Sequence, residues 1–142
     1  MNRHQSRVLA IQYGYHSILN NKSSLSDGSV DVFWKEQSLS EDKHVVDSYF
    51  LTLVRGVKNN LLEIDDLINK NLENWKIERV ERVDLSILRV SIFEMLFAET
   101  KIPAAIAINE AVEIAKRFSV KDSPSFINGV LDSLVKKQNI DS

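Results

Sequence analysis

The sequence contains no cysteine among its 142 residues, and it has only four glycines and two prolines. The absence of cysteine excludes disulfides, thiolate nucleophiles and cysteine-ligated metal sites. So few glycines and prolines leave few tight turns for an all-β fold. No apolar run approaches the roughly 18 to 20 residues that a membrane-spanning helix needs, and the N-terminus lacks the apolar block of a signal peptide. We therefore expect a cytoplasmic protein.

Charge is unevenly distributed along the chain, although the formal net charge is only −2. No acidic residue precedes Asp27, whereas the rest of the chain carries all 20 acidic residues and 15 of the 18 basic ones. The lysine, arginine and histidine residues before Asp27 are Arg3, His4, Arg7, His16 and Lys22. Composition leaves two interpretations open for this segment: a helix with solvated charges, or an arm that binds nucleic acid.

Apolar residues recur at helical spacing along most of the chain, and no segment alternates convincingly as a strand would. The periodic segments are residues 7–19, 30–37 (the weakest), 44–57, 61–75, 78–99, 103–118 and 123–134. The hydrophobic content of 44% is enough to bury the core of one domain. We predict an all-α fold of about seven helices in two small helical bundles that form one domain. The N-terminal sub-bundle would cover about residues 1–75, and the C-terminal one about residues 76–142.

The segment from Glu78 to Glu99 is the most apolar part of the chain, and its apolar residues fall on more than one helical face. A helix that is apolar nearly all round is a buried, central helix. Asp84, Arg89 and Glu94 interrupt this pattern. Intramolecular pairing where the sub-bundles meet is the favoured interpretation for them, ahead of contact with a partner.

The stretch SPSFINGVLDSL contains Asn128-Gly129, a dipeptide that is typical of a tight hairpin turn. The apolar residues around it do not alternate, and instead follow helical spacing from residue 127 to residue 134. Ser123 and Pro124 suit the N-cap and the first position of a helix. We therefore predict a helix, in which Gly129 costs about 1 kcal/mol relative to alanine. We expect close helix packing at Gly129 to offset this cost and to bring residues 122–126 near the basic N-terminal segment.

The sequence shows no motif that indicates catalysis. Histidines occur only in the first 44 residues, without metal-ligand spacing, and the glycines are isolated, so no loop cradles a phosphate. No GxSxG nucleophile motif is present. Most carboxylates fall on polar helix faces, where they are solvated. We expect a protein that is not an enzyme and that has no catalytic residue, metal or cofactor.

Three stretches in the C-terminal half together resemble the NusB family of bacterial transcription antitermination factors. They are VDLSILRVSIFEML (residues 83–96), INEAVEIAK (residues 108–116) and FINGVLD (residues 126–132). The resemblance implies an all-α, non-enzymatic adaptor that binds single-stranded boxA RNA of ribosomal RNA operons. It also implies pairing with NusE, a ribosomal small-subunit protein, within the RNA polymerase antitermination complex.

The resemblance further assigns roles to individual residues. Basic side chains would contact phosphates and aromatic faces would stack on bases, as single-stranded RNA requires. The implied RNA-binding residues are Arg3, His4 and Arg7 in the first helix, and Lys121, Asp122 and Phe126 near the start of the last one. Phe126 is either a stacking platform or a core residue, and Asp122 would lower the affinity by repulsion. Tyr15 and Asp84 match positions that the family uses against NusE.

Two other interpretations stay open at this point. One is a module related to the RNA-binding domain of ribosomal RNA cytosine methyltransferases, whose catalytic domain carries S-adenosylmethionine and cysteine motifs. Because this chain ends at Ser142 without cysteine, we expect only a stand-alone relative of that domain. The other is a helical protein-interaction scaffold that has lost RNA binding. The family resemblance allows either a monomer or a homodimer.

Overall fold

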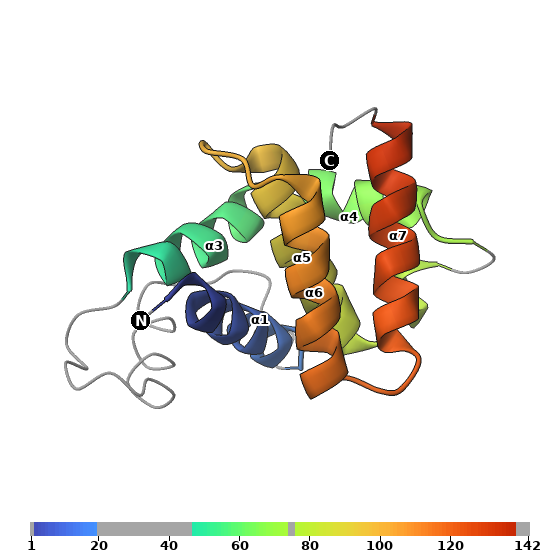
Figure 1. Cartoon of the computed structure of the whole chain (residues 1–142), viewed down its shortest axis with the longest axis horizontal. Coiled ribbons are helices and arrows are strands. Elements are labelled where there is room, and N and C mark those ends of the chain that lie inside the picture. The colour runs from blue at the N-terminus through green and yellow to red at the C-terminus, as the bar shows by residue number, and fades with distance from the viewer. Residues whose placement is uncertain (1, 20–46, 74–75, 139–142) are drawn as a thin grey trace.

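The computed structural model describes residues 2–19, 47–73 and 76–138 (Figure 1). Over these ranges the chain forms six α-helices, a short 3-10 helix and one π-helical segment, and it contains no strand. The all-α prediction is confirmed. The expected helix at residues 30–37 and the end of the expected 61–75 helix at Trp75 lie outside the described residues. No helix in the described ranges combines the length and apolarity needed to cross a membrane.

The helices begin and end close to the limits that periodicity predicts. They are α1 (Arg3–Leu19), α3 (Ser48–Asn59), α4 (Leu61–Lys70), η1 (Ile77–Arg79), α5 (Arg82–Ile92), η2 (Phe93–Phe97), α6 (Ala104–Phe118) and α7 (Ser123–Lys137). Side chains of Asp47 and Glu81 cap α3 and α5 by accepting hydrogen bonds from backbone N–H groups in the first turn. The expected cap of α7 was wrong by one residue, because Ser123 is already helical and Asp122 takes the N-cap position without a side-chain bond.

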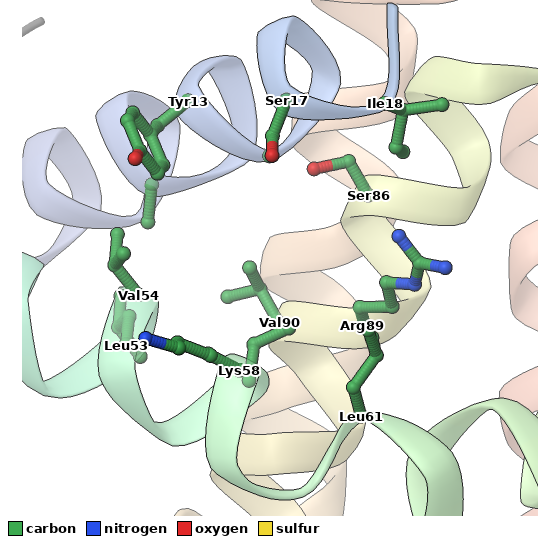
Figure 2. Close-up of a pocket in the computed structure, with 13 residues that line it drawn as sticks. Tyr13, Ser17, Ile18, Leu53, Val54, Lys58, Leu61, Ser86, Arg89 and Val90 are labelled. Atoms are coloured by element: carbon green, nitrogen blue, oxygen red, sulfur yellow. The ribbon is translucent and has the colours of Figure 1, made fainter. Parts of the chain in front are cut away.

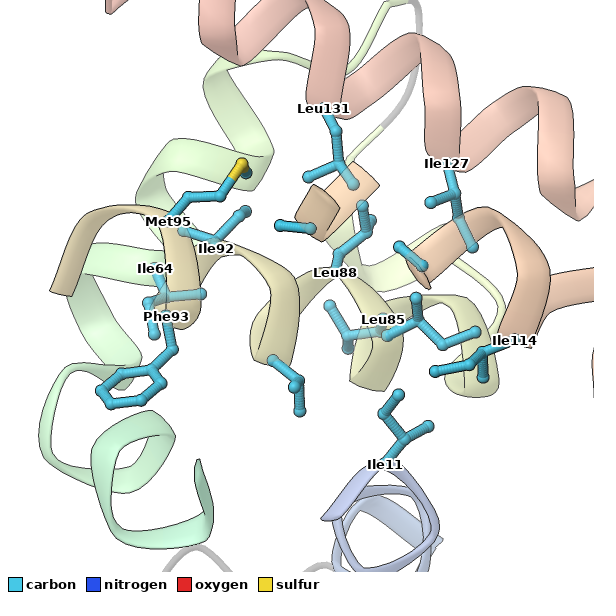
Figure 3. Packing of buried hydrophobic residues seen from close by; sticks show 14 of the residues in the cluster. Ile11, Ile64, Leu85, Leu88, Ile92, Phe93, Met95, Ile114, Ile127 and Leu131 are labelled. Atoms are coloured by element: carbon cyan, nitrogen blue, oxygen red, sulfur yellow. The ribbon is translucent and has the colours of Figure 1, made fainter. Parts of the chain in front are cut away.

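Helix α5 lies at the centre of the molecule, as its apolar sequence predicts. It contacts each of the other five described α-helices, and eight of its eleven residues are buried. Figure 3 shows side chains of α1, α4, α6 and α7 gathered around it. The division into sub-bundles near residue 75 stays a prediction, because α5 contacts helices on both sides of that boundary.

Close helix packing occurs at Gly14 and Gly56, and not at Gly129 as the sequence predicts. A Cβ atom at Gly56 would overlap the ring of Phe93, and one at Gly14 would overlap the hydroxyl of Ser86. At Gly129 nothing lies within 4 Å of the corresponding position. The prediction for Gly129 was therefore wrong: the residue lies on the exposed face of α7, where no neighbouring helix needs the space.

Alanine substitution should separate these two kinds of glycine. We expect Gly129→Ala to raise the free energy of unfolding by about 0.8–1 kcal/mol, because alanine favours the helix and meets no neighbour. Gly56→Ala, the matched control, should lower it, because the Phe93 ring must move. Urea denaturation followed by circular dichroism measures both. A destabilising Gly129→Ala would mean that an unseen contact requires the glycine.

Candidate nucleic-acid interface

The first turn of α1 presents cationic and titratable groups between α3 and α6. The guanidinium carbon of Arg3 lies 4.6 Å from the centroid of the Tyr49 ring, a cation–π distance, and Arg3 is exposed. His4 Nδ1 lies 3.0 Å from Glu110 Oε2, and 41% of the His4 side chain is accessible. Both expected RNA-binding side chains of this turn therefore remain within reach of an external ligand.

Arg7 lies in the interior, although the sequence suggests that it contacts a phosphate. Its Nε donates to both carboxylate oxygens of Glu94 at 2.9 Å, and its Nη1 donates to Glu110 at 2.8 Å. Only 7% of the Arg7 side chain and 2% of that of Glu94 are accessible. The Tyr49 hydroxyl also donates to Glu94, and burial together with this bond raises the pKa of Tyr49 to about 12. Because the guanidinium is buried and paired with two carboxylates, Arg7 holds α1 in place and offers little surface to an external ligand.

Removing Arg7 should destabilise the fold strongly. Arg7→Ala leaves the buried Glu94 carboxylate without its cation, so we expect the free energy of unfolding to fall by about 3–5 kcal/mol. Arg3→Ala, which removes an exposed cation four positions earlier, should cost no more than about 1 kcal/mol. Chemical denaturation of the two variants measures the difference. Equal losses would show that the Arg7–Glu94 pair is not the stronger contact.

A second cationic surface lies where α6 ends and the chain turns into α7. We call it the α6–α7 corner and define it by Arg117, Phe118, Lys121 and Asp122. Phe118 is 38% exposed and Val120 is 60% exposed, and the guanidinium carbon of Arg117 lies 5.1 Å from the centroid of the Phe118 ring. Lys121 and Asp122 are exposed. The corner thus combines cations with a partly exposed aromatic ring.

Phe118 is the functional candidate that sequence reasoning missed. Its position continues the apolar stripe of the 103–118 helix, which indicates a core residue, whereas Phe126 is outside its stripe. In the structure the roles are exchanged: Phe118 is exposed, whereas Phe126 is partly buried and packs against the core. The available signal is the string AKRF: Phe118 directly follows two cations at the very end of a helix, where the stripe no longer guarantees burial.

The two cationic surfaces do not meet, contrary to the sequence prediction. His4 contacts Glu110 in the middle of α6, whereas the α6–α7 corner begins at the end of that helix, near Phe118. Eight residues of α-helix span about 12 Å. In Figure 1 the corner lies beyond the lower end of α6, away from the start of α1. A ligand that touches both surfaces must therefore run along α6.

Asp84, one of the two expected partner-binding residues, is buried below the α6–α7 corner with 4% of its surface exposed. Its Oδ1 accepts from the Ser119 hydroxyl at 2.6 Å and its Oδ2 accepts from the Ser123 hydroxyl at 2.8 Å. The two hydroxyl oxygens are themselves 2.8 Å apart. Tyr15, the other expected partner residue, is partly buried on α1.

The number of hydrogens in this ring of three short contacts favours a protonated Asp84. Each serine hydroxyl supplies one proton, so two serines can serve only two of the three contacts. All three contacts are hydrogen bonds at once only when the carboxyl of Asp84 carries a proton and donates it to one serine, which in turn donates to the other. Burial raises the pKa of Asp84, the two hydroxyl bonds oppose that rise, and the nearby carboxylate of Glu81 adds to it. The neutral acid is thus favoured to a higher pH than for an exposed aspartate.

This shift makes stability depend on pH with a defined sign. A carboxyl whose folded-state pKa is raised stabilises the fold fully below its unfolded pKa of about 3.9, and this contribution disappears as pH rises through the folded-state value. We therefore expect the stability of the unsubstituted chain relative to Asp84→Asn to fall as pH increases from about 4. Urea denaturation of both proteins between pH 4 and pH 8 measures this difference, and other titrating groups cancel. Parallel pH profiles would contradict the assignment.

A pocket of ≈ 300 Å³ lies between α1, α3 and α5. Figure 2 shows mainly aliphatic side chains around it, with Lys58 and Arg89 among the polar ones. Arg89 forms a bidentate ion pair with Asp65 at 2.9 and 2.8 Å, and the Ser86 hydroxyl donates to the carbonyl of Ile11. Arg89 and Ser86 are thus engaged in contacts that hold helices together. Within the described ranges, no group of three or more His, Asp or Glu side chains could hold a metal ion.

Five described α-helices around a buried central one, with cations and an exposed aromatic ring at a helix end, define a small helical domain suited to nucleic acid. Comparison with models of protein families matches residues 4–136 to the NusB family, and the chain belongs to that family. The resemblance inferred from the three sequence stretches is confirmed.

Individual relatives agree with this membership. A transcription antitermination protein NusB from Desulforapulum autotrophicum is 42% identical over 141 residues, which cover 98% of this chain and 94% of the relative. The solved structure of T. maritima NusB is 31% identical with a TM-score of 0.79, over 96% of this chain and 92% of that one. A crystal structure of the antitermination factors NusB and NusE in complex with dsRNA shares the fold, with a TM-score of 0.75 at 23% identity over 96% of this chain and 99% of that one.

Proposed function

We propose that this chain is a transcription antitermination factor that binds boxA-type RNA together with the ribosomal protein NusE. Membership of the NusB family supports this role. A relative that is 42% identical is named a transcription antitermination protein. A structure of the same fold holds both NusE and RNA. The protein acts in the cytoplasm within the RNA polymerase antitermination complex, and it catalyses no reaction. The match over residues 4–136 does not favour the methyltransferase-related alternative.

The observation that carries the proposal is the exposed ring of Phe118 with cations beside it. Unstacked bases of single-stranded RNA stack on aromatic faces, which contributes about 1–3 kcal/mol per base, while lysine and arginine bind the phosphates. At the α6–α7 corner, Arg117 and Lys121 supply the cations and Phe118 supplies the face. Arg3 provides a second cation beside Tyr49, and His4 lies next to it against the middle of α6.

A titration with boxA-containing RNA tests this proposal. We expect the affinity to rise markedly when NusE is present, because the protein pair offers a larger RNA-binding surface. Phe118→Ala should weaken RNA binding by about 1–3 kcal/mol through the loss of one stacking contact. Val120→Ala removes a neighbouring exposed apolar group that has no π-face, and should leave the affinity unchanged. Fluorescence anisotropy measures each constant.

Two results would contradict the proposal. One is an RNA titration curve that is the same with and without NusE. The other is an equal loss of affinity in Phe118→Ala and Val120→Ala, which would show that general apolar contact, and not base stacking, supports the binding.

A further inference from the structure

The turn between α6 and α7 is held at both ends by one buried carboxyl group. Ser119 precedes the exposed residues 120–122, Ser123 follows them, and the hydroxyls of both serines donate to Asp84 at 2.6 and 2.8 Å. The backbone N–H of Ser123 also donates to the carbonyl of Val120 at 3.0 Å, which closes the turn. A side chain of α5 therefore fixes a surface loop that is remote in sequence.

The surroundings of Asp84 show that its side chain makes its contacts within the chain. Ser123 is 2% exposed and Asp84 is 4% exposed, so neither side chain offers its polar atoms to an external molecule. In the part of the chain that the structure describes, no lysine or arginine forms an ion pair with Asp84. Glu81 lies on its solvent side, where it caps α5 and approaches the Ser119 hydroxyl at 3.4 Å. Both oxygens of the carboxyl group are thus hydrogen-bonded to the two serines.

The loop held in this way contains the groups that would contact RNA. Phe118 is bonded directly to Ser119, and Lys121 lies midway between the two serines. Residues 120–122 are exposed, so few packing contacts of their own restrict them. A loop that is already ordered avoids the entropy cost of ordering on binding, and this raises its affinity.

We propose that Asp84 is a positioning residue for RNA: by holding Ser119 and Ser123 it sets the directions of Phe118 and Lys121. The inference rests on the proposed function and deepens it, because it assigns to RNA binding a residue that the sequence suggests for NusE binding. Asp84 itself touches neither ligand.

The test compares the Ser119→Ala/Ser123→Ala double variant with the unsubstituted chain, in complex with NusE and boxA-containing RNA. Neither substitution changes the charge. We expect RNA affinity to fall by about fivefold to a hundredfold, because two side chains must then be ordered on binding. The slope of log K against log salt should decrease in magnitude by about 0.7, the value for one lost phosphate contact on a single strand. A merely less stable protein would not change this slope.

Three further variants sharpen the result. Lys121→Ala should produce the same change in slope, and its combination with the double variant should cause no additional change. Ser119→Thr keeps the hydroxyl and should retain normal binding. Asp84→Asn is tested for NusE binding as described below. Asp132→Asn, which removes an exposed carboxylate on α7, is its control. Thermal unfolding confirms that each protein is folded, and the single Ser119→Ala variant replaces the double one if the latter unfolds.

The outcomes separate this inference from the proposed function. RNA binding that is absent from the unsubstituted chain, with and without NusE, overturns the proposed function and the positioning role together. Normal RNA affinity and an unchanged salt slope in the serine variants overturn the positioning role alone. Calorimetry with NusE in the absence of RNA provides the last distinction: we expect unchanged affinity in Asp84→Asn. A loss confined to NusE binding would make Asp84 a partner-binding residue instead.

Discussion

The buried ion pair of Arg7 with Glu94 determines where the first helix lies, and the candidate interface depends on that placement. Both side chains are almost completely buried, and removing two charges from water is costly unless their hydrogen-bonding groups are satisfied. Glu110 and the Tyr49 hydroxyl supply the remaining bonds. One guanidinium therefore joins α1 to the π-helical segment after α5, to α6 and, through Tyr49, to α3. Arg3 and His4, one turn earlier, are left at the surface as a consequence.

Helical periodicity predicted most of the fold because burial against a central helix is what the periodicity reflects. The apolar segment 78–99 was correctly assigned as the centre, and the intramolecular pairing expected for Asp84, Arg89 and Glu94 is confirmed by contacts with serines, Asp65 and Arg7. The partners could not be predicted, because each lies at least 24 residues away in the sequence and only the packing brings them together.

The errors concern residues whose role depends on a neighbour that the sequence does not identify. Gly129 looks the same in sequence as Gly56, yet only Gly56 faces a ring. Arg7 belongs to a basic segment, but its charge is neutralised from two other helices. Phe118 continues an apolar stripe, but the helix ends there and leaves the ring exposed. In each case the type of residue and its place on a helix were predicted correctly. Its role was predicted wrongly, because that role depends on neighbours from other helices.

The π-helical segment η2 changes how residues after α5 must be counted. In it the N–H of Ala98 donates to the carbonyl of Phe93, five residues back, at 2.9 Å, so one turn holds an additional residue. At the start of this segment, Phe93 packs against Gly56 and its neighbour Glu94 binds the guanidinium of Arg7. If the α-helical period of 3.6 residues is continued through this turn, later residues are assigned to a helix face about 100° away from the one they occupy. Register along the longest apolar segment of the chain is therefore discontinuous, and faces before and after residue 93 have to be read separately.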